Sequence, residues 1–448
     1  MFGQKVQAFD PKEASKTRLE ETFTPAASIR EHYNVIHEEV IKAIDPSVII
    51  TLSASELETR ISEMVSDIAI SKQLPLGQKD VSYSVEQLLN EFLGLGPLQP
   101  LIEDTGITDI MVNGYREVYV ERSGKLQKAA VQFRSEEQLL NLARRIVSKV
   151  GRRIDESNPL VDARLEDGSR VNVIIPPLAL DGTYISIRKF NEKKLTLSQL
   201  AQFGAMSKSM IKLIDIIVRS RLNVLVAGGT GAGKTTLLNA MSFSISPQER
   251  IITIEDTAEL HLQQPHVVRT ETRPANAEGL IPITQRELVK NALRMRPDRI
   301  ILGEVRGDEA FEMMQAMNTG HDGSLCTLHA NSAIDALVRM ENLLMMSQAT
   351  LPLFSLRRQI ADTIDVIIQV ERMRDGKRRV VSITELQRLD GEQYVTQELF
   401  TFKILSEDQQ GNLIGEYRSA KCIPCFNNKA KYHQLDTQLR VAMELEIE

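Results

Sequence analysis

The sequence predicts an α/β protein in which a parallel sheet, covered by helices on both faces, follows an α+β domain and an N-terminal helical module. Three patterns support this prediction. Apolar stretches of strand length alternate with helical patterns across residues 223–329. Alternating apolar and polar residues with turn signals fill residues 107–190, and helical spacing dominates the first 75 residues. We therefore expect three domains, at residues 1–78, 79–190 and 191–448.

The helical module begins the chain. Residues 32–44 and 56–70 place apolar side chains three and four positions apart, which indicates two amphipathic helices. Pro75 and Gly77 interrupt this pattern, and a helical pattern resumes at residue 84 before the Gly/Pro-rich stop at residues 94–97. We therefore place the first domain boundary between residues 78 and 79.

Hairpins indicate the α+β domain. Asn113-Gly114 and Ser123-Gly124 provide turns within a period-two stretch at residues 107–133. Ser135 begins a capping-box pattern for a helix that Gly151 ends. A second hairpin around residues 167–168 and a strand at residues 183–190 complete this domain.

The remaining chain alternates helices and strands. Helical patterns occupy residues 207–220, 234 onward, 284–295 and 308–320, and apolar strand patterns occupy residues 223–228, 250–255, 298–304 and 323–329. This alternation is typical of a parallel sheet with helices on both faces.

Composition excludes several classes of protein. The chain has 448 residues, of which 42% are hydrophobic and 25% charged, so it is neither a disulfide knot nor a disordered chain. A net charge of −6 argues against a direct nucleic-acid partner. Three cysteines indicate a reducing compartment. Without an apolar stretch suited to a secretory signal or a membrane span, we expect a cytoplasmic protein with at most peripheral membrane contact.

The stretch GGTGAGKTT predicts a nucleotide site because it follows an apolar strand and opens a helix. Its glycines let backbone N–H groups face phosphates. Lys234 would hold the β- and γ-phosphates, and the Thr235 hydroxyl would bind Mg²⁺. The expected nucleotide-binding residues of this loop are Gly228, Gly229, Thr230, Gly231, Ala232, Gly233, Lys234, Thr235 and Thr236.

Carboxylates and histidines follow or flank the neighbouring strands. Glu304 ends one strand, where an acid can stand beside Mg²⁺ or an attacking water. The segment TIEDTAEL places Glu255, Asp256 and Glu259 after another strand, where they could face the same phosphate. His321 and His329 flank a third strand.

Together these segments resemble the Walker A, Asp-box, Walker B and His-box signatures of the secretion ATPase superfamily, the hexameric motors of type II secretion, type IV pili and type IV secretion. Within it, FLGLGPLQPLI, TDIMVNG, DARLEDGSRVNVIIPPLALDG and HVVRTETRPANAEG look closest to the tight-adherence (Tad/Flp) pilus assembly ATPases, CpaF-like. The resemblance covers most of the chain and implies a RecA-like ATPase domain.

The resemblance also implies roles for individual residues. It makes Glu304 the Walker B acid and a ligand of Mg²⁺ through the nucleotide, and it gives His321 a nucleotide contact. The other residues that it makes catalytic are Glu255, Asp256, His329 and three arginines of the preceding domain, Arg164, Arg170 and Arg188.

The function expected from this resemblance is that of a homohexameric motor powered by Mg²⁺ and ATP. It would act on an inner-membrane platform protein to assemble a tight-adherence (Flp) pilus and would associate peripherally with that membrane. A type IV secretion or conjugation ATPase that moves DNA or effectors shares the same boxes and stays open. A non-hydrolysing nucleotide switch would require a damaged box, and all four boxes are intact.

Two further patterns receive structural interpretations. Cys422 and Cys425 form a C-x-x-C pair without a second pair of ligands, so we expect no zinc and interpret CIPCF as a closing strand. Met313, Met314 and Met317 are interpreted as helix-packing residues.

Overall fold

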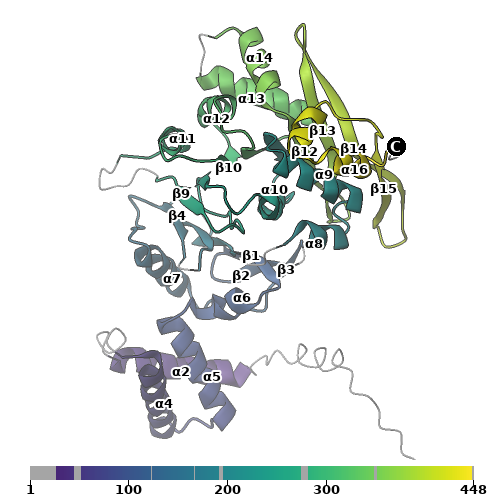
Figure 1. Cartoon of the computed structure of the whole chain (residues 1–448). Coiled ribbons are helices and arrows are strands. Elements are labelled where there is room, and N and C mark those ends of the chain that lie inside the picture. Colours follow the sequence, from purple (N-terminus) through teal and green to yellow (C-terminus); the bar gives the residue numbers. More distant parts are fainter. Residues whose placement is uncertain are drawn as a thin grey trace, which may run out of the picture. The chain divides into compact units, whose positions relative to one another are not determined.

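The computed structural model describes residues 27–44, 52–122, 124–165, 167–190, 195–273, 281–347 and 351–445. The chain divides into two compact units, Met1–Asn191 and Glu192–Glu448, which Figure 1 shows in purple to blue and in teal to yellow. This division lies one residue from the expected boundary between residues 190 and 191. Among the described helices, none is both long and apolar enough to cross a membrane.

Among the described residues of the first unit, three helices form a small bundle: α2 (Ala27–Ala43), α4 (Ala54–Ser71) and α5 (Gln78–Phe92). A capping box begins α4, because Ser53 accepts the backbone N–H of Glu56 and the Glu56 carboxylate accepts the N–H of Ser53. Val85 and Leu88 of α5 pack into the same core as the apolar residues of α2 and α4. The bundle therefore continues past residue 78, where the sequence analysis ended it, because α5 buries its apolar face against the two earlier helices.

The rest of the first unit is an antiparallel sheet with the strand order β3-β2-β1-β6-β5-β4. Short helical segments η1 (Gly96–Leu98) and α6 (Gln99–Glu103) precede it. Its strands are β1 (Ile107–Asn113), β2 (Glu117–Arg122), β3 (Lys125–Lys128), β4 (Leu160–Arg164), β5 (Arg170–Ile174) and β6 (Tyr184–Arg188). Helix α7 (Glu136–Lys149) buries Leu139, Ala143 and Ile146 in the core of this sheet. The hairpins predicted around residues 113–114 and 167–168 are present.

The second unit contains a nine-stranded sheet with the order β15-β14-β13-β12-β7-β11-β10-β8-β9. Six neighbouring strands are parallel, β12, β7, β11, β10, β8 and β9. Their bounds are β7 (Val224–Gly228), β8 (Ile251–Glu255), β9 (Val267–Glu271), β10 (Arg299–Val305), β11 (Leu325–Leu328) and β12 (Val366–Arg372). This sheet confirms the predicted α/β, RecA-like class.

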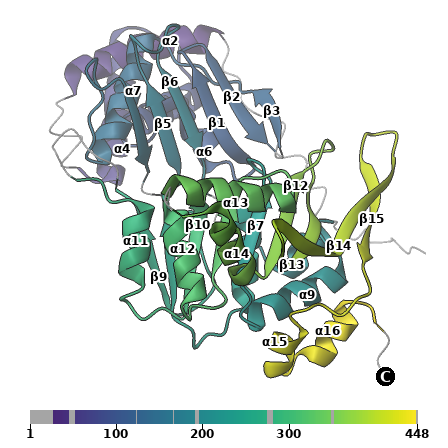
Figure 2. The same cartoon turned by 90° about the horizontal axis from the view of Figure 1, so that it is seen from above.

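Both faces of the parallel sheet are covered, as Figure 2 shows. One core contains Val224 and Val226 of β7 with α8 (Leu197–Gln202), α9 (Lys208–Arg219) and α10 (Lys234–Met241). The opposite core contains Leu225 and Ala227 of the same strand. The helices of this second core are α11 (Gln285–Ala292), α12 (Glu309–Asn318), α13 (Ala333–Ser347) and α14 (Leu353–Thr363). Alternating residues of β7 thus enter two cores, which explains why all five are buried.

Helix α12 carries the three methionines that the sequence analysis interpreted as helix-packing residues. The side chains of Met313, Met314 and Met317 are at most 2% exposed and belong to the second core. Their predicted role in helix packing is confirmed.

An antiparallel meander extends the sheet beyond β12 through β13 (Arg378–Asp390), β14 (Gln393–Glu407) and β15 (Leu413–Ser419). Two helices follow, α15 (Asn427–Tyr432) and α16 (Asp436–Ala442). The interpretation of CIPCF as a closing strand is wrong, because Cys422 and Cys425 lie in irregular chain between β15 and α15. There the backbone N–H of Phe426 donates to the side-chain Oε1 of Glu385 in β13, 2.9 Å away, rather than to the backbone of a neighbouring strand.

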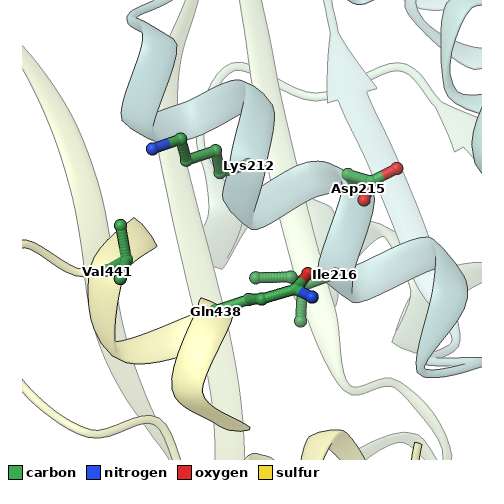
Figure 3. Close-up of a pocket in the computed structure, with 5 residues that line it drawn as sticks. All are labelled: Lys212, Asp215, Ile216, Gln438 and Val441. Carbon is green, nitrogen blue, oxygen red and sulfur yellow. The ribbon is translucent and has the colours of Figure 1, made fainter. Parts of the chain in front are cut away.

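The C-terminal helix α16 packs against α9, and a hollow of about 220 Å³ lies between them (Figure 3). Its lining residues are Lys212, Asp215, Ile216, Gln438 and Val441. This hollow contains no residue that the sequence predicted for the nucleotide site.

A buried arginine joins three segments at the amino end of β10. Arg299 binds both carboxylate oxygens of Glu249, at 2.7 and 3.0 Å. It also donates to the carbonyls of Gly323 and Val218, at 3.1 and 2.9 Å. Its side chain is 1% exposed, so its charge depends on these partners.

We expect Arg299→Ala to destabilise the second unit by about 3–5 kcal/mol, because Glu249 would keep a half-buried charge without its main partner. The shift in the urea unfolding midpoint measures this effect. Arg219→Ala provides the control, since Arg219 pairs with Asp215 on the surface of α9 and should cost less than about 1 kcal/mol. Equal shifts for the two variants would contradict the expectation.

Candidate nucleotide-binding site

The glycine-rich loop connects the buried strand β7 to the first turn of α10. Gly228 ends β7, and a Cβ on it would lie 2.3 Å from the carbonyl oxygen of Val370 in the neighbouring strand. Gly233 precedes α10 with a φ of 101°, a conformation that side chains disfavour. The loop therefore presents backbone N–H groups at a helix N-terminus, where the helix dipole favours an anion.

Lys234, the first residue of α10, is 8% exposed. Its Nζ donates to the carbonyls of Gly228 and Gly229, both at 3.0 Å, and lies 3.3 Å from His329 Nε2. Burial lowers the pKa of Lys234, and the charge of Glu304 opposes this effect. The ammonium group is thus held within the loop, near a carboxylate from another strand.

Glu304 of β10 lies between two partners. Its Oε1 is 2.9 Å from His329 Nε2, and its Oε2 accepts a hydrogen bond of 2.7 Å from Arg306. Burial alone would raise the pKa of Glu304, but Arg306, His329 and Lys234 outweigh burial and hold this pKa below its ordinary value. Glu304 is therefore ionised at neutral pH.

His329 follows β11 and joins Lys234 to Glu304. Burial and the charge of Lys234 lower the pKa of His329, while Glu304 partly opposes them. The neutral ring can accept a hydrogen bond from Lys234 at Nε2, whereas its 2.9 Å contact with Glu304 Oε1 lacks hydrogen-bond geometry. The structure therefore brings together three predicted residues, Glu304 and His329 at the carboxyl ends of β10 and β11 and Lys234 after the loop that follows β7.

The Asp-box carboxylates occupy different environments. Glu255 is 3% exposed, and its Oε2 accepts the backbone N–H groups of Glu259 and Leu260 at 2.7 and 2.9 Å. Asp256 is exposed and, together with Glu259, acts on Arg306 through its charge. The charge of Glu259 also raises the pKa of Lys234. Glu255 thus fixes the loop that carries Glu259, whereas Asp256 and Glu259 face the charged groups of the site.

Glu255 predicts a pH dependence of stability. Burial raises its pKa from 4.5 to about 7 in the folded chain. The folded state prefers the protonated form of Glu255. The contribution of this carboxyl group to the free energy of unfolding is therefore complete below about pH 4.5 and is lost as the pH rises to about 7. The loss amounts to about 3 kcal/mol.

We therefore expect Glu255→Gln to stabilise the chain more at pH 8 than at pH 5, because the amide needs no ionisation and its oxygen can still accept both N–H groups. Urea unfolding of both proteins at the two pH values measures this difference. Glu371→Gln, which changes an exposed carboxylate on β12, is the control. An equal gain in the free energy of unfolding at both pH values would contradict the raised pKa of Glu255.

Three arginines of the first unit lie in register across neighbouring strands. Arg164 of β4 is opposite Arg170 of β5, and Arg170 is opposite Arg188 of β6. Directly opposed residues share one face of a sheet. Arg188 Nε is 3.3 Å from Asp109 Oδ1, and Arg164 donates to the carbonyl of Gly168. Arginines that lie directly opposite one another repel, and guanidinium groups are well suited to binding phosphate.

His321 is not placed with the loop. It precedes β11, whereas His329 follows that strand, and β11 runs parallel to β7. The two histidines therefore lie at opposite edges of the sheet, more than about 10 Å apart at ~3.3 Å per residue. His321 Nδ1 lies 3.2 Å from the carbonyl of Ala316 near the end of α12. The sequence analysis grouped the two histidines because it treated the residues before and after β11 as one segment.

The structure adds residues that the sequence analysis did not assign. Arg306 binds Glu304 from two positions further along the chain. The sequence could have indicated this residue, because it belongs to the same Walker B segment. Glu259 of the TIEDTAEL segment was expected only to face the phosphate and was not among the predicted site residues. Arg378 donates its Nε–H to the carbonyl of Gly231 over 2.8 Å. No local pattern could have revealed that contact, because 147 residues separate its partners.

Comparisons with known proteins place these features in a family. The family described as "Type II/IV secretion system protein" matches residues 91–418. A Mycobacterium tuberculosis protein whose name associates it with conjugal transfer is 40% identical over 322 residues, which cover 70% of this chain and 91% of that protein. The type IV secretion system protein VirB11 of Bartonella quintana is 31% identical over 325 residues, covering 64% and 91% of the two chains. The crystal structure of the Brucella suis VirB11 ATPase with sulphate shares 29% identity, covers 64% of this chain and 95% of its own, and has a TM-score of 0.35.

Proposed function

Because this chain belongs to the family of type II/IV secretion system proteins, we propose that it is an ATP-hydrolysing motor that works with Mg²⁺ as a homohexamer. The observation that supports this proposal best is the convergence of Lys234, Glu304 and His329 at one edge of the parallel sheet. A lysine that holds phosphate and a residue that orients the attacking water are recurring parts of enzymes that transfer a phosphoryl group, and in this chain His329 lies between the two.

The residues at this edge fit a nucleotide with its magnesium ion. The Thr235 hydroxyl follows Lys234 in the first turn of α10, and Glu304 supplies a carboxylate. Hydroxyl and carboxylate oxygens are ligands that Mg²⁺ prefers. When bound, Mg²⁺ would neutralise phosphate charge and polarise the γ-phosphate.

The chain's own residues would then perform separate tasks. Glu304 would orient the attacking water, and Lys234 would stabilise the charge that develops on the γ-phosphate. Exchange of the contact with His329 for contacts to ligand would free Glu304 for this role. Arg164, Arg170 and Arg188 would add guanidinium groups from the first unit. Loss of the γ-phosphate would weaken that attraction, so turnover would drive motion between the units.

We further propose that this motion drives assembly of a tight-adherence pilus through a platform protein at the cytoplasmic face of the inner membrane. The segments FLGLGPLQPLI, TDIMVNG and DARLEDGSRVNVIIPPLALDG support this assignment. The second candidate is a type IV secretion or conjugation ATPase. The names of the relatives from M. tuberculosis and B. quintana favour it.

ATP hydrolysis combined with light scattering tests the motor. We expect turnover that requires Mg²⁺ and a species of about six times 50.3 kDa. A monomer that binds ATP without turnover would contradict the proposal. Stimulation of turnover by DNA would favour the conjugation candidate, whereas stimulation by membranes that contain the platform protein would favour the pilus.

A further inference from the structure

The hairpin between β12 and β13 lies beside the glycine-rich loop. Strand β12 pairs with β7 as far as Val370, which is opposite Gly228. The chain turns at residues 373–377, and Arg378 begins β13. Figure 2 shows β12 and β13 on the side of β7 that is opposite to β10, the strand of Glu304. The glycine-rich loop is therefore flanked by the β12–β13 hairpin on the side away from the predicted catalytic residues.

Arg378 binds this loop at Gly231 and lies close to Gly233. Its Nε donates to the carbonyl oxygen of Gly231 over 2.8 Å. Its Cδ lies 3.3 Å from the position that a Cβ on Gly233 would occupy. Each peptide unit directs its N–H and its carbonyl in opposite directions. A donor that holds the Gly231 carbonyl therefore also fixes the orientation of the Ala232 N–H in the same peptide, which donates to the Gly229 carbonyl within the loop at 3.3 Å.

A buried ion pair fixes the hairpin that carries Arg378. Arg379 Nη2 lies 2.7 Å from Asp375 Oδ2, and these side chains are 5% and 1% exposed. The hydrogen bond from Arg379 holds the pKa of Asp375 well below its usual range. Asp375 also accepts the backbone N–H of Leu413 in β15, at 3.1 Å, and Arg379 lies over the ring of Phe402. The backbone at Arg378 is therefore anchored to the antiparallel meander.

We propose that Arg378 is a positioning residue for the glycine-rich loop, which it holds in the conformation that binds nucleoside di- and triphosphates. This inference rests on the proposed nucleotide function and assigns the meander a role in it. Arg378 acts through the Gly231 carbonyl on the side of β7 away from Glu304, so it influences nucleotide affinity and leaves the hydrolytic step unchanged.

Hydrogen exchange of the nucleotide-free chain tests the positioning directly. We expect Arg378→Ala to speed amide exchange in residues 229–233, and Arg378→Lys to restore part of the protection because an ammonium group can also donate to a carbonyl. Arg374→Ala is the matched control. It removes the same charge from the same hairpin, but Arg374 pairs with Glu407 of β14 instead of the loop.

Titration with ADP and Mg²⁺ by calorimetry, together with steady-state ATP hydrolysis, tests the consequence. We expect Arg378→Ala to raise the Kd of ADP and the KM of ATP about fivefold, a modest change because Arg378 is exposed. We expect kcat and the thermal midpoint to stay within about twofold and about 2 °C of wild type.

Unchanged exchange in residues 229–233, or the same change in Arg374→Ala, would overturn the inference. A fall in kcat at constant KM would also overturn it. If wild type binds ADP without hydrolysing ATP, the proposed motor fails while the exchange and ADP measurements still decide the role of Arg378. If wild type binds no nucleotide, the inference falls together with the nucleotide function.

Discussion

Lys234→Met is expected to abolish detectable ATP hydrolysis, with a loss in kcat of at least about 10²–10³-fold, and to weaken nucleotide binding. The methionine keeps most of the side-chain volume and removes the ammonium group that the loop holds beside Gly228 and Gly229. Because burial disfavours the charged form of Lys234, the loss of this charge should not lower the thermal midpoint. The expected result is therefore inactivity in a chain of undiminished stability.

Turnover assays and thermal unfolding of three proteins measure this prediction. Lys212→Met is the matched control, since Lys212 lies on α9 at the hollow shown in Figure 3. It should retain wild-type turnover. Turnover by Lys234→Met at more than about a tenth of the wild-type rate would remove Lys234 from phosphate binding.

Glu304→Gln is expected to lower kcat by about 10²–10³-fold while nucleotide binding is retained. The amide can preserve a contact with Arg306, but it has no negative charge with which to orient and polarise a water. The loss of the carboxylate also removes a group that raises the pKa of His329. The histidine therefore stays neutral, and no new positive charge replaces the lost negative one.

The test compares single-turnover hydrolysis with ADP affinity in the variant and in Glu416→Gln. Glu416 is a partly exposed residue of β15 that pairs with Arg418, so its variant should match wild type in both assays. Parallel losses of affinity and turnover in Glu304→Gln would show that Glu304 supports the fold of the site rather than the hydrolytic step.

The sequence predicted the centre of this site because parallel strands end at a common edge. Gly228 ends β7, Glu304 lies near the end of β10, and His329 follows β11, so their order along the chain was sufficient to bring them together. The same rule, applied strictly, would have separated His321 from them, since it precedes β11. The roles of individual carboxylates needed coordinates, because only burial distinguishes Glu255 from the exposed Asp256.

Long-range packing limited the rest of the prediction. Helix α5 appeared to begin a new domain because Pro75 and Gly77 interrupt the helical pattern, yet its apolar face completes the core of α2 and α4. The CIPCF segment has the composition of a strand, but β15 already ends at Ser419. The contact between Arg378 and Gly231 depends on a meander that joins the parallel sheet at β12, and such pairings are set by tertiary structure.

Gly228 connects the nucleotide motif to the architecture of the sheet. Any larger residue there would collide with the Val370 carbonyl and force β7 away from β12. The first glycine of the motif is therefore required by strand spacing, whatever the loop binds. A chain of this fold that had lost its ligand would still be under selection to keep Gly228, whereas Lys234 would be free to drift. A retained glycine at this position therefore indicates only that the sheet is intact, whereas a retained lysine indicates that the site still binds phosphate.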